Sequence, residues 1–342
     1  MKKINYVLLL LIFATVFSFS ACKKQDEKPE TKPQKTVEQP QTPSESEFYT
    51  KIMQNTHRPV AVMIDNDDEK ARPQLGLESA YLVYEIIVEG GSSRFMALFN
   101  DLSIDKVGPV RSSRHYFLDY AMENDAIYAH CGYSPQAARD IKNFGINNIN
   151  GVIGSDGSMF WRDNTYDRSW HNLYTSPKKL AEFAKTNKGY RTDSDVKLLE
   201  YSKNDTDFSG DTANKIFLGY SNRYKVSYEY DAQNKNYIRY VNGKQHMSQT
   251  GNALTAKNII VYQVSNYLLN DGENKGRQTI ENIGSGTGIY FTDGKAVNIN
   301  WNKPSRNAKT VYTLSDGSNL VLNPGNTFIQ IVPKNQSVSY EQ

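Results

Sequence analysis

The start of the chain most constrains what the rest can fold into, because it decides where folding takes place. Residues 1–3 (MKK) are basic, residues 6–19 are apolar and uncharged, and two small residues precede Cys22. This order is typical of a cleaved secretory signal. The apolar stretch is shorter than the ~20 residues that a transmembrane helix needs. We therefore predict that residues 1–21 are a signal peptide and that the remainder folds outside the cytoplasm.

The residues around Cys22 predict a lipid anchor. The segment resembles a bacterial lipobox, in which the cysteine is acylated and becomes the first mature residue, although Phe19 stands where a leucine is usual. Each buried methylene of an acyl chain contributes ~0.8 kcal/mol to membrane binding. An ordinary signal peptide with an incidental cysteine is the alternative. We expect attachment through Cys22 to the outer face of the cell membrane.

Cysteine content and charge limit the remaining possibilities. With Cys22 acylated, Cys131 has no partner in the chain, so no disulfide is expected. The formal charge of +3 falls to +1 when the two leader lysines are removed, which gives no electrostatic case for a nucleic-acid partner. Zinc-finger spacings are absent, and neither a metal site nor a cofactor is expected.

Composition divides the mature chain into three parts. Residues 22–47 contain the lipidated cysteine and then a segment with four prolines and one aliphatic residue, Val37, which predicts a disordered tether. Residues 48–205 mix strand and helix patterns, and residues 206–342 are rich in strand patterns. The predicted fold class is α+β, with an α/β N-terminal domain built on a mixed sheet and a smaller β-rich C-terminal domain.

Hydrophobic periodicity and turn residues predict the elements of both regions. Strands are expected over residues 60–64, 81–88, 94–99, 126–130, 224–230, 259–264 and 327–332. A helix is expected over 112–122, and Ser134-Pro135 and Ser176-Pro177 each predict a helix start with a capping serine. Asn242-Gly243 predicts a hairpin turn.

Several long segments resemble the DUF3048 family, the YerB-type lipoproteins of Gram-positive bacteria. They are RPVAVMIDN (58–66), ARPQLGLESAYLVYEIIVEGGSSRFMALF (71–99), VGPVRSSRHYFLDYA (107–121), FWRD (160–163), HNLYTS (171–176) and LNPGNTFIQIVP (322–333). The resemblance covers nearly all of the globular chain and implies an N-terminal domain followed by a separate C-terminal domain. The family has no assigned function, so the resemblance does not settle an activity.

Charged residues within apolar strands are the first candidates for a site, because buried charges must be paired or face a cleft. Asp65 ends an apolar strand, where α/β folds often place site residues, although it could instead form an Asx turn into Asp67. Glu85 and Glu89 lie ~13 Å apart if both belong to one straight strand, too far for a glycosidase pair. Either glutamate could pair with Asp65, or with an arginine at position 94, 111 or 114.

Arg111 and Arg114 are the most suggestive local pair. If a helix starts there, the two guanidinium groups share its first turn with free backbone N–H groups, and together they suit a phosphate or carboxylate. The alternative is that both arginines neutralise Glu85, Glu89 or Asp119 inside the protein.

Histidines and aromatic residues complete the candidate set. His130 and His171 are possible general acids or bases, whereas Cys131 is expected to be a buried small residue. The segments 160–163 and 170–174 combine aromatic faces with polar groups, which suits sugar rings and also plain loop packing. The candidates for catalysis are Asp65, Glu85, Glu89, His130 and His171, and those for ligand binding are Arg72, Arg94, Arg111, Arg114, Arg162 and Asn172.

These observations predict a lipoprotein whose N-terminal cleft binds an anionic or sugar-containing envelope ligand related to peptidoglycan. The first alternative is a cell-wall hydrolase or lyase that uses Asp65, Glu85 or Glu89 with His130 or His171. The second is a surface scaffold whose strand edges bind protein partners. Neither a GxSxG nor an HExxH motif is present.

Overall fold

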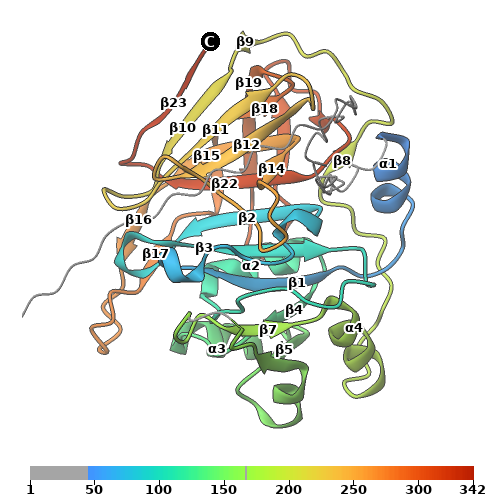
Figure 1. Ribbon diagram of the computed structural model, residues 1–342, viewed down its shortest axis with the longest axis vertical. Coiled ribbons are helices and arrows are strands. Elements are labelled where there is room, and N and C mark those ends of the chain that lie inside the picture. The colour runs from blue at the N-terminus through green and yellow to red at the C-terminus, as the bar shows by residue number, and fades with distance from the viewer. Residues whose placement is uncertain (1–44, 166–167) are drawn as a thin grey trace, which may run out of the picture. The chain divides into compact units, whose positions relative to one another are not determined.

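The computed structural model describes residues 45–165 and 168–342, and its main feature is one large mixed sheet (Figure 1). Cys22 and most of the predicted tether lie outside these residues. Among the described residues the sheet has 11 strands, in the order β20-β19-β18-β15-β22-β2-β3-β1-β4-β5, and β9 pairs with β19. The strands are β1 (Val60–Asn66), β2 (Leu82–Ile87), β3 (Ser93–Phe99), β4 (Ile127–His130), β5 (Asn148–Asn150), β9 (Asp211–Thr212), β15 (Asn258–Val264), β18 (Gly284–Thr292), β19 (Lys295–Lys303), β20 (Val311–Leu314) and β22 (Thr327–Pro333).

The central strands of this sheet are buried on both faces. Every residue of β1, β2, β3 and β22 is buried, and their sequences are nearly continuous apolar runs rather than alternating ones. This pattern is typical of strands covered on both sides. β22 is parallel to both β2 and β15, whereas β3 is antiparallel to β1 and β2. β22, which comes late in the chain, thus lies between β15 and the early strand β2 and pairs with both.

Four α-helices occur among the described residues: α1 (Glu45–Met53), α2 (His115–Glu123), α3 (Pro135–Asn143) and α4 (Pro177–Thr186). The predicted caps at Ser134 and Ser176 are confirmed, since each hydroxyl accepts the N–H of the residue three positions later. The predicted helix over 112–122 is wrong at its start. Residues up to Arg114 stay extended because Ser113 N–H pairs with Gly132 O, and the helix begins only at His115.

Short 3-10 helices connect several strands. They are η1 (Glu69–Ala71), η2 (Leu77–Ser79), η3 (Glu89–Gly91) and η4 (Gly154–Met159).

A smaller sheet is formed by the second half of the chain, in the order β13-β12-β11-β10-β23, with β14 pairing to β12. Its strands are β10 (Lys215–Gly219), β11 (Lys225–Asp231), β12 (Asn236–Val241), β13 (Lys244–Gln245), β14 (Thr255–Ala256) and β23 (Val338–Glu341). The predicted hairpin at Asn242-Gly243 is confirmed, and both residues have the positive φ that such a turn requires. Two-stranded pairs are β6 (Phe160–Arg162) with β7 (Leu173–Thr175), β8 (Glu200–Tyr201) with β21 (Val321–Leu322), and β16 (Asn266–Leu268) with β17 (Gln278–Ile280).

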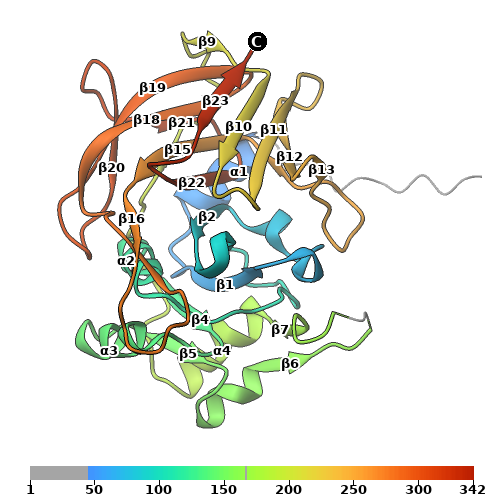
Figure 2. The same ribbon diagram turned by 90° about the vertical axis from the view of Figure 1, so that its left-hand side faces the viewer.

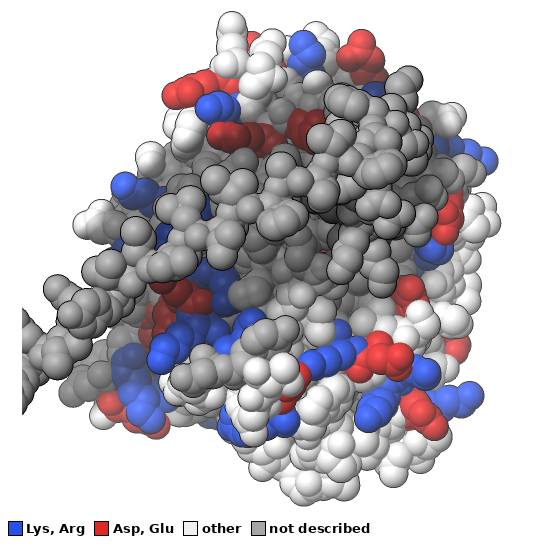
Figure 3. Space-filling model, viewed as in Figure 1, with Lys and Arg blue, Asp and Glu red and all other residues white. Residues whose placement is uncertain are grey.

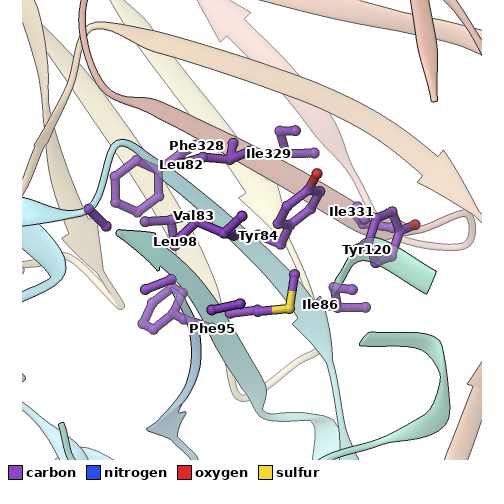
Figure 4. Packing of buried hydrophobic residues seen from close by; sticks show 14 of the residues in the cluster. Leu82, Val83, Tyr84, Ile86, Phe95, Leu98, Tyr120, Phe328, Ile329 and Ile331 are labelled. Atoms are coloured by element: carbon purple, nitrogen blue, oxygen red, sulfur yellow. The ribbon is translucent and has the colours of Figure 1, made fainter. Parts of the chain in front are cut away.

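The hydrophobic core joins the two halves of the chain. Apolar side chains of β2 and β3 pack with Phe328, Ile329 and Ile331 of β22 (Figure 4). The smaller sheet lies beside the main one (Figure 2), and Tyr228 of β11 meets Phe328 edge-on at 6.4 Å. Aromatic contacts of this kind stabilise the packing of the two sheets by more than the burial of apolar area alone would.

The α+β fold class is confirmed, with few helices and a large mixed sheet next to smaller sheets. The described residues up to Gln342 form one compact unit, and the main sheet takes strands from both sides of the expected boundary at residue 205. That boundary stays a prediction. None of the described helices is long and apolar enough to cross a membrane.

Candidate functional site

The polar residues of interest meet at the carboxyl end of β1, where an extended segment separates it from β4. The two strands are paired over residues 60–62 and 127–129. Beyond that point the segment 109–113 enters between them: Asp65 N–H donates to Pro109 O, Arg111 N–H to Met63 O and Cys131 N–H to Arg111 O. This insertion places the side chains of residues 111–114 next to the loop that follows β1.

Asp65 is the centre of this arrangement. Its carboxylate is 1% exposed. The Oδ2 atom accepts a hydrogen bond from His171 Nδ1 at 2.7 Å and lies 3.1 Å from Arg111 Nε. Oδ1 accepts the N–H of Asp67, so the Asx turn considered for Asp65 is present as well. A buried carboxylate is therefore satisfied on both oxygens, as burial of its charge requires.

Alternating charges continue outward from Asp65. Arg111 bonds Asp67 at 2.8 Å, Arg94 lies 3.6 Å from Asp67 and 3.7 Å from Glu89, and Arg114 holds Glu89 with two bonds of 2.5 and 2.9 Å. We name this series the ion-pair chain; its members are Asp65, Arg111, Asp67, Arg94, Glu89 and Arg114. The two-pronged Arg114 contact is the strong, directional kind. Of the alternatives for Arg114, neutralisation by Glu89 is the one present here.

The arginines lower the pKa values of two carboxyl groups in the ion-pair chain, Asp67 and Glu89. Burial alone raises the pKa of Asp67, but Arg94 and Arg111 outweigh it and hold the pKa below the ordinary value of 3.8. Burial acts on Glu89 in the same way, and the bonds from Arg114 bring its pKa below 4.5. Neither group is suited to donate a proton near neutral pH.

Trp170, His171 and Asp68 form the outer side of the site. The rings of Trp170 and His171 stack at 3.6 Å between centroids, and Arg111 Cζ lies 3.8 Å from the Trp170 ring. His171 is 1% exposed, whereas the Asp68 side chain is 54% exposed. His171 Nε2 lies 3.4 Å from Asp68 Oδ2 and has no hydrogen-bond partner among the residues that the structure describes.

The other predicted site residues lie apart from the ion-pair chain or at its margin. Arg72 donates to Asn66 Oδ1 at 2.8 Å, near the end of β1. Arg162 donates to Asn172 Oδ1 at 2.5 Å, so these two residues satisfy each other in the loop around β6 and β7. His130 is buried in β4, where its ring bonds Gly132 and Asn148, and burial lowers its pKa to about 4. The structure therefore brings Asp65 together with His171, and not with His130.

Glu85 belongs to a different, fully buried network. The expected partners at positions 94, 111 and 114 are wrong, because Arg239 of β12 lies 3.0 Å from Glu85 Oε2 and donates to Oε1 at 3.1 Å. Tyr224 also donates to Oε1, at 2.7 Å. Glu89 follows the end of β2 and lies in η3, so the straight-strand spacing from Glu85 does not apply. This network joins the halves of the chain.

Sequence reasoning missed several members of these networks. Asp67, Asp68 and Arg239 were not candidates, although the run Asp65-Asn66-Asp67-Asp68 already showed three carboxylates after a buried strand.

Cys131 is a half-buried free thiol, and burial raises the pKa of this thiol. Two hollows of the described surface, of about 20 and 430 Å³, are lined by residues outside the ion-pair chain. The site at the end of β1 therefore combines the buried Asp65, Arg94 and His171 with the partly exposed Arg111, Asp68 and Trp170.

Comparison with known proteins places the chain in a family. Residues 48–191 match the model described as "Protein of unknown function (DUF3048) N-terminal domain", and residues 216–329 match the corresponding C-terminal domain. The chain is 31% identical over 320 residues to "Putative lipoprotein YerB" of Bacillus subtilis (strain 168), which covers 93% of this chain and 92% of that protein. The crystal structure of YerB from Bacillus subtilis matches with a TM-score of 0.71, over 83% of this chain and 94% of that one. The resemblance seen in the sequence is confirmed, and the chain belongs to the DUF3048 family.

Proposed function

We propose that the protein is an extracytoplasmic lipoprotein, anchored through Cys22, whose site at the carboxyl end of β1 binds a sugar-containing ligand of the cell envelope, related to peptidoglycan. The similarity to a protein named as a lipoprotein supports the anchor. The observation that carries the ligand site is the ion-pair chain, whose side chains are fixed by one another while Arg111, Asp68 and Trp170 remain partly exposed. Side chains held in place before binding lose little entropy on contact with a ligand.

The charge balance favours the sugar-containing ligand over a simple anion. Each arginine of the chain already contacts at least one carboxylate, so the site carries no excess positive charge for a phosphate. The partly exposed Arg111 lies over Trp170, which is 47% exposed, and the exposed Asp68 lies beside His171. Such a mixture matches hydroxyl groups and the zwitterionic parts of a peptide. On the face seen in Figure 3, basic and acidic side chains are likewise interspersed.

The hydrolase alternative retains one supporting observation, the bond between Asp65 and His171. A carboxylate that orients a histidine is a recurrent arrangement for proton transfer. Glycoside hydrolysis, however, needs a carboxylic acid with a raised pKa, and the pKa values of Asp67 and Glu89 are both lowered. Recognition therefore accounts for more of the site than hydrolysis does.

The test is a titration of the full chain in detergent with soluble peptidoglycan fragments, followed by calorimetry. Asp68→Asn should weaken binding ~10- to 100-fold, because a charged hydrogen bond contributes ~1.5–3 kcal/mol. Asp207→Asn, an exposed aspartate in the segment before β9, is the matched control and should bind as the wild type does. The proposal fails if no fragment binds, or if both variants bind like the wild type. Release of new reducing ends or peptides from the fragments would favour the hydrolase.

The anchor is tested separately by Cys22→Ser, which removes the acylation site. The mature chain should then leave the membrane fraction and appear in the medium, because the acyl chains supply the attachment. Membrane association that survives a salt wash in this variant would contradict the lipid anchor.

A further inference from the structure

Two polar atoms, His171 Nε2 and Asp68 Oδ2, face each other beside Asp65 with no hydrogen bond between them. A carboxylate oxygen accepts, so we assign the proton of the bond between His171 and Asp65 to Nδ1. His171 Nε2 then faces Asp68 Oδ2, 3.4 Å away, and no hydrogen bond joins these two atoms. Nε2 is buried and unpaired among the described residues, and an unpaired buried polar atom is costly. A cation between the two atoms resolves this arrangement.

The separation of these atoms fits a tetrahedral metal ion. Zinc binds histidine nitrogen at ~2.0–2.1 Å and carboxylate oxygen at ~2.0–2.2 Å, so two such ligands at a tetrahedral angle lie roughly 3.3–3.5 Å apart. The observed separation is 3.4 Å. The distance between the two atoms therefore fits a shared ion.

Both side chains are already oriented by contacts on their far sides. Asp65 holds His171 Nδ1 at 2.7 Å, and the backbone N–H of Lys70 holds Asp68 Oδ1 at 2.7 Å. Metal ligands usually show this support: the histidine donates its other N–H to a carboxylate, and the ligating carboxylate accepts a bond of its own. The surroundings thus favour coordination through Nε2 and Oδ2.

The local charge also accommodates a cation. Asp65, Asp67 and Asp68 contribute three negative charges, while Arg94 and Arg111 are the guanidinium groups paired with the first two. The Asp68 carboxylate is left uncompensated by an arginine among these contacts. Because it is more than half exposed, an ion can reach it from solvent. Three negative and two positive charges leave a net charge of −1, which a bound divalent cation changes to +1.

We propose that His171 Nε2 and Asp68 Oδ2 bind a divalent transition-metal ion of the zinc type. Residues 45–165 and 168–342 contain no group of three or more metal-binding side chains, so the protein supplies two ligands here and water the others. Open positions of this kind belong to metal sites that contact a ligand rather than to structural ones. The inference does not rest on the proposed envelope ligand, since it follows from the His171 and Asp68 geometry alone.

The test uses the full chain without a histidine tag, in detergent and freed of metal with a chelator, titrated with Zn²⁺ by calorimetry. We expect one equivalent to bind, and Co²⁺ to give the visible absorption of a tetrahedral site. Asp68→Asn and His171→Gln each remove a ligand and should weaken binding more than Asp65→Asn does. Asp65→Asn should weaken it ~10- to 100-fold, because Asp65 only orients the histidine. Mg²⁺ should not compete, since it prefers oxygen ligands in octahedral geometry.

His57→Gln is the matched control, because it removes an exposed histidine outside the site. Equal zinc binding in the wild type, Asp68→Asn and His171→Gln, or an equal loss in His57→Gln, would overturn the proposal. Asp68 is exposed, so its variant decides the question even if His171→Gln does not fold. Repeating the peptidoglycan titration with metal-free protein separates the two proposals. Fragments that bind while zinc does not would contradict only the metal site, and zinc that binds while fragments do not would contradict only the envelope ligand.

Discussion

At the scale of single residues, the fully buried pair of Glu85 and Arg239 is the most consequential contact between the two halves of the chain. Both side chains are 0% exposed. Hydroxyl groups of Tyr224 and Tyr228 and the Nδ1 atom of His246 complete the guanidinium's hydrogen bonds. The pKa of Arg239 is raised, since the attraction of Glu85 outweighs the burial that lowers it. The contact is therefore costly to break.

We expect Arg239→Ala to destabilise the protein by ~3–5 kcal/mol, because Glu85 is left charged and alone in the interior. The combined Glu85→Gln, Arg239→Met variant should lose less, since no uncompensated charge remains. Urea denaturation followed by fluorescence measures both. The exposed ion pair of Lys244 and Glu69 provides the control, and Lys244→Ala should change stability little. A small loss in Arg239→Ala would mean that water reaches the pair.

His130 gives a prediction for pH dependence. Burial lowers its pKa from 6.5 to about 4, so the folded state keeps the ring neutral while the unfolded state takes up a proton below pH 6.5. This contribution to stability is present at neutral pH and is lost between pH 6.5 and 4. His130→Gln should therefore lose less stability than the wild type over that interval, as measured by urea denaturation at each pH. Parallel pH profiles for the two proteins would contradict the assignment.

Residue identities in the site could be predicted better than their partners. Asp65, Arg94 and Arg111 stand out because charges within apolar segments must be compensated. The partner of Glu85 could not be found this way, because Arg239 is 154 residues further along the chain. Asp67 and Asp68 looked like ordinary turn residues, and only the folded chain shows that one contacts two arginines. Distance in sequence, rather than residue type, limited the prediction.

At the scale of elements, the sequence predicts the starts of those helices that have their own capping residues. Ser134 and Ser176 were sufficient to place the starts of α3 and α4, since a capping hydroxyl followed by proline acts within one turn. The start of α2 was mispredicted because segment 109–113 forms backbone bonds to β1 and to the residues after β4. Tertiary pairing overrode local helix propensity there, as it often does.

We expect Ser134→Ala to cost ~1 kcal/mol of stability, because the N–H of Ala137 loses its partner at the start of α3. The measurement is the shift of the urea midpoint at constant slope. Ser315→Ala, at an exposed position, serves as control and should leave the midpoint in place. An equal shift in both variants would show that the cap contributes nothing specific.

At the scale of the whole molecule, the two matched family domains share one sheet. β22 belongs to the C-terminal half yet pairs with β2 of the N-terminal half over five residue pairs. We expect the halves to unfold together, so calorimetry of the full chain should show one transition with equal calorimetric and van't Hoff enthalpies. Two resolved transitions would instead support independent domains on either side of residue 205.

The position of β22 means that the main sheet cannot be completed until this late segment of the chain has been synthesised. The strand that fills the gap between β2 and β15 comes from residues 327–333, so it is synthesised after both of its neighbours. Until it arrives, β2 and β15 each carry an open edge of unpaired backbone, which other chains and proteases can engage. A product truncated before this strand cannot close its sheet. We therefore expect a chain that ends before residue 327 to be degraded faster than one that contains β22.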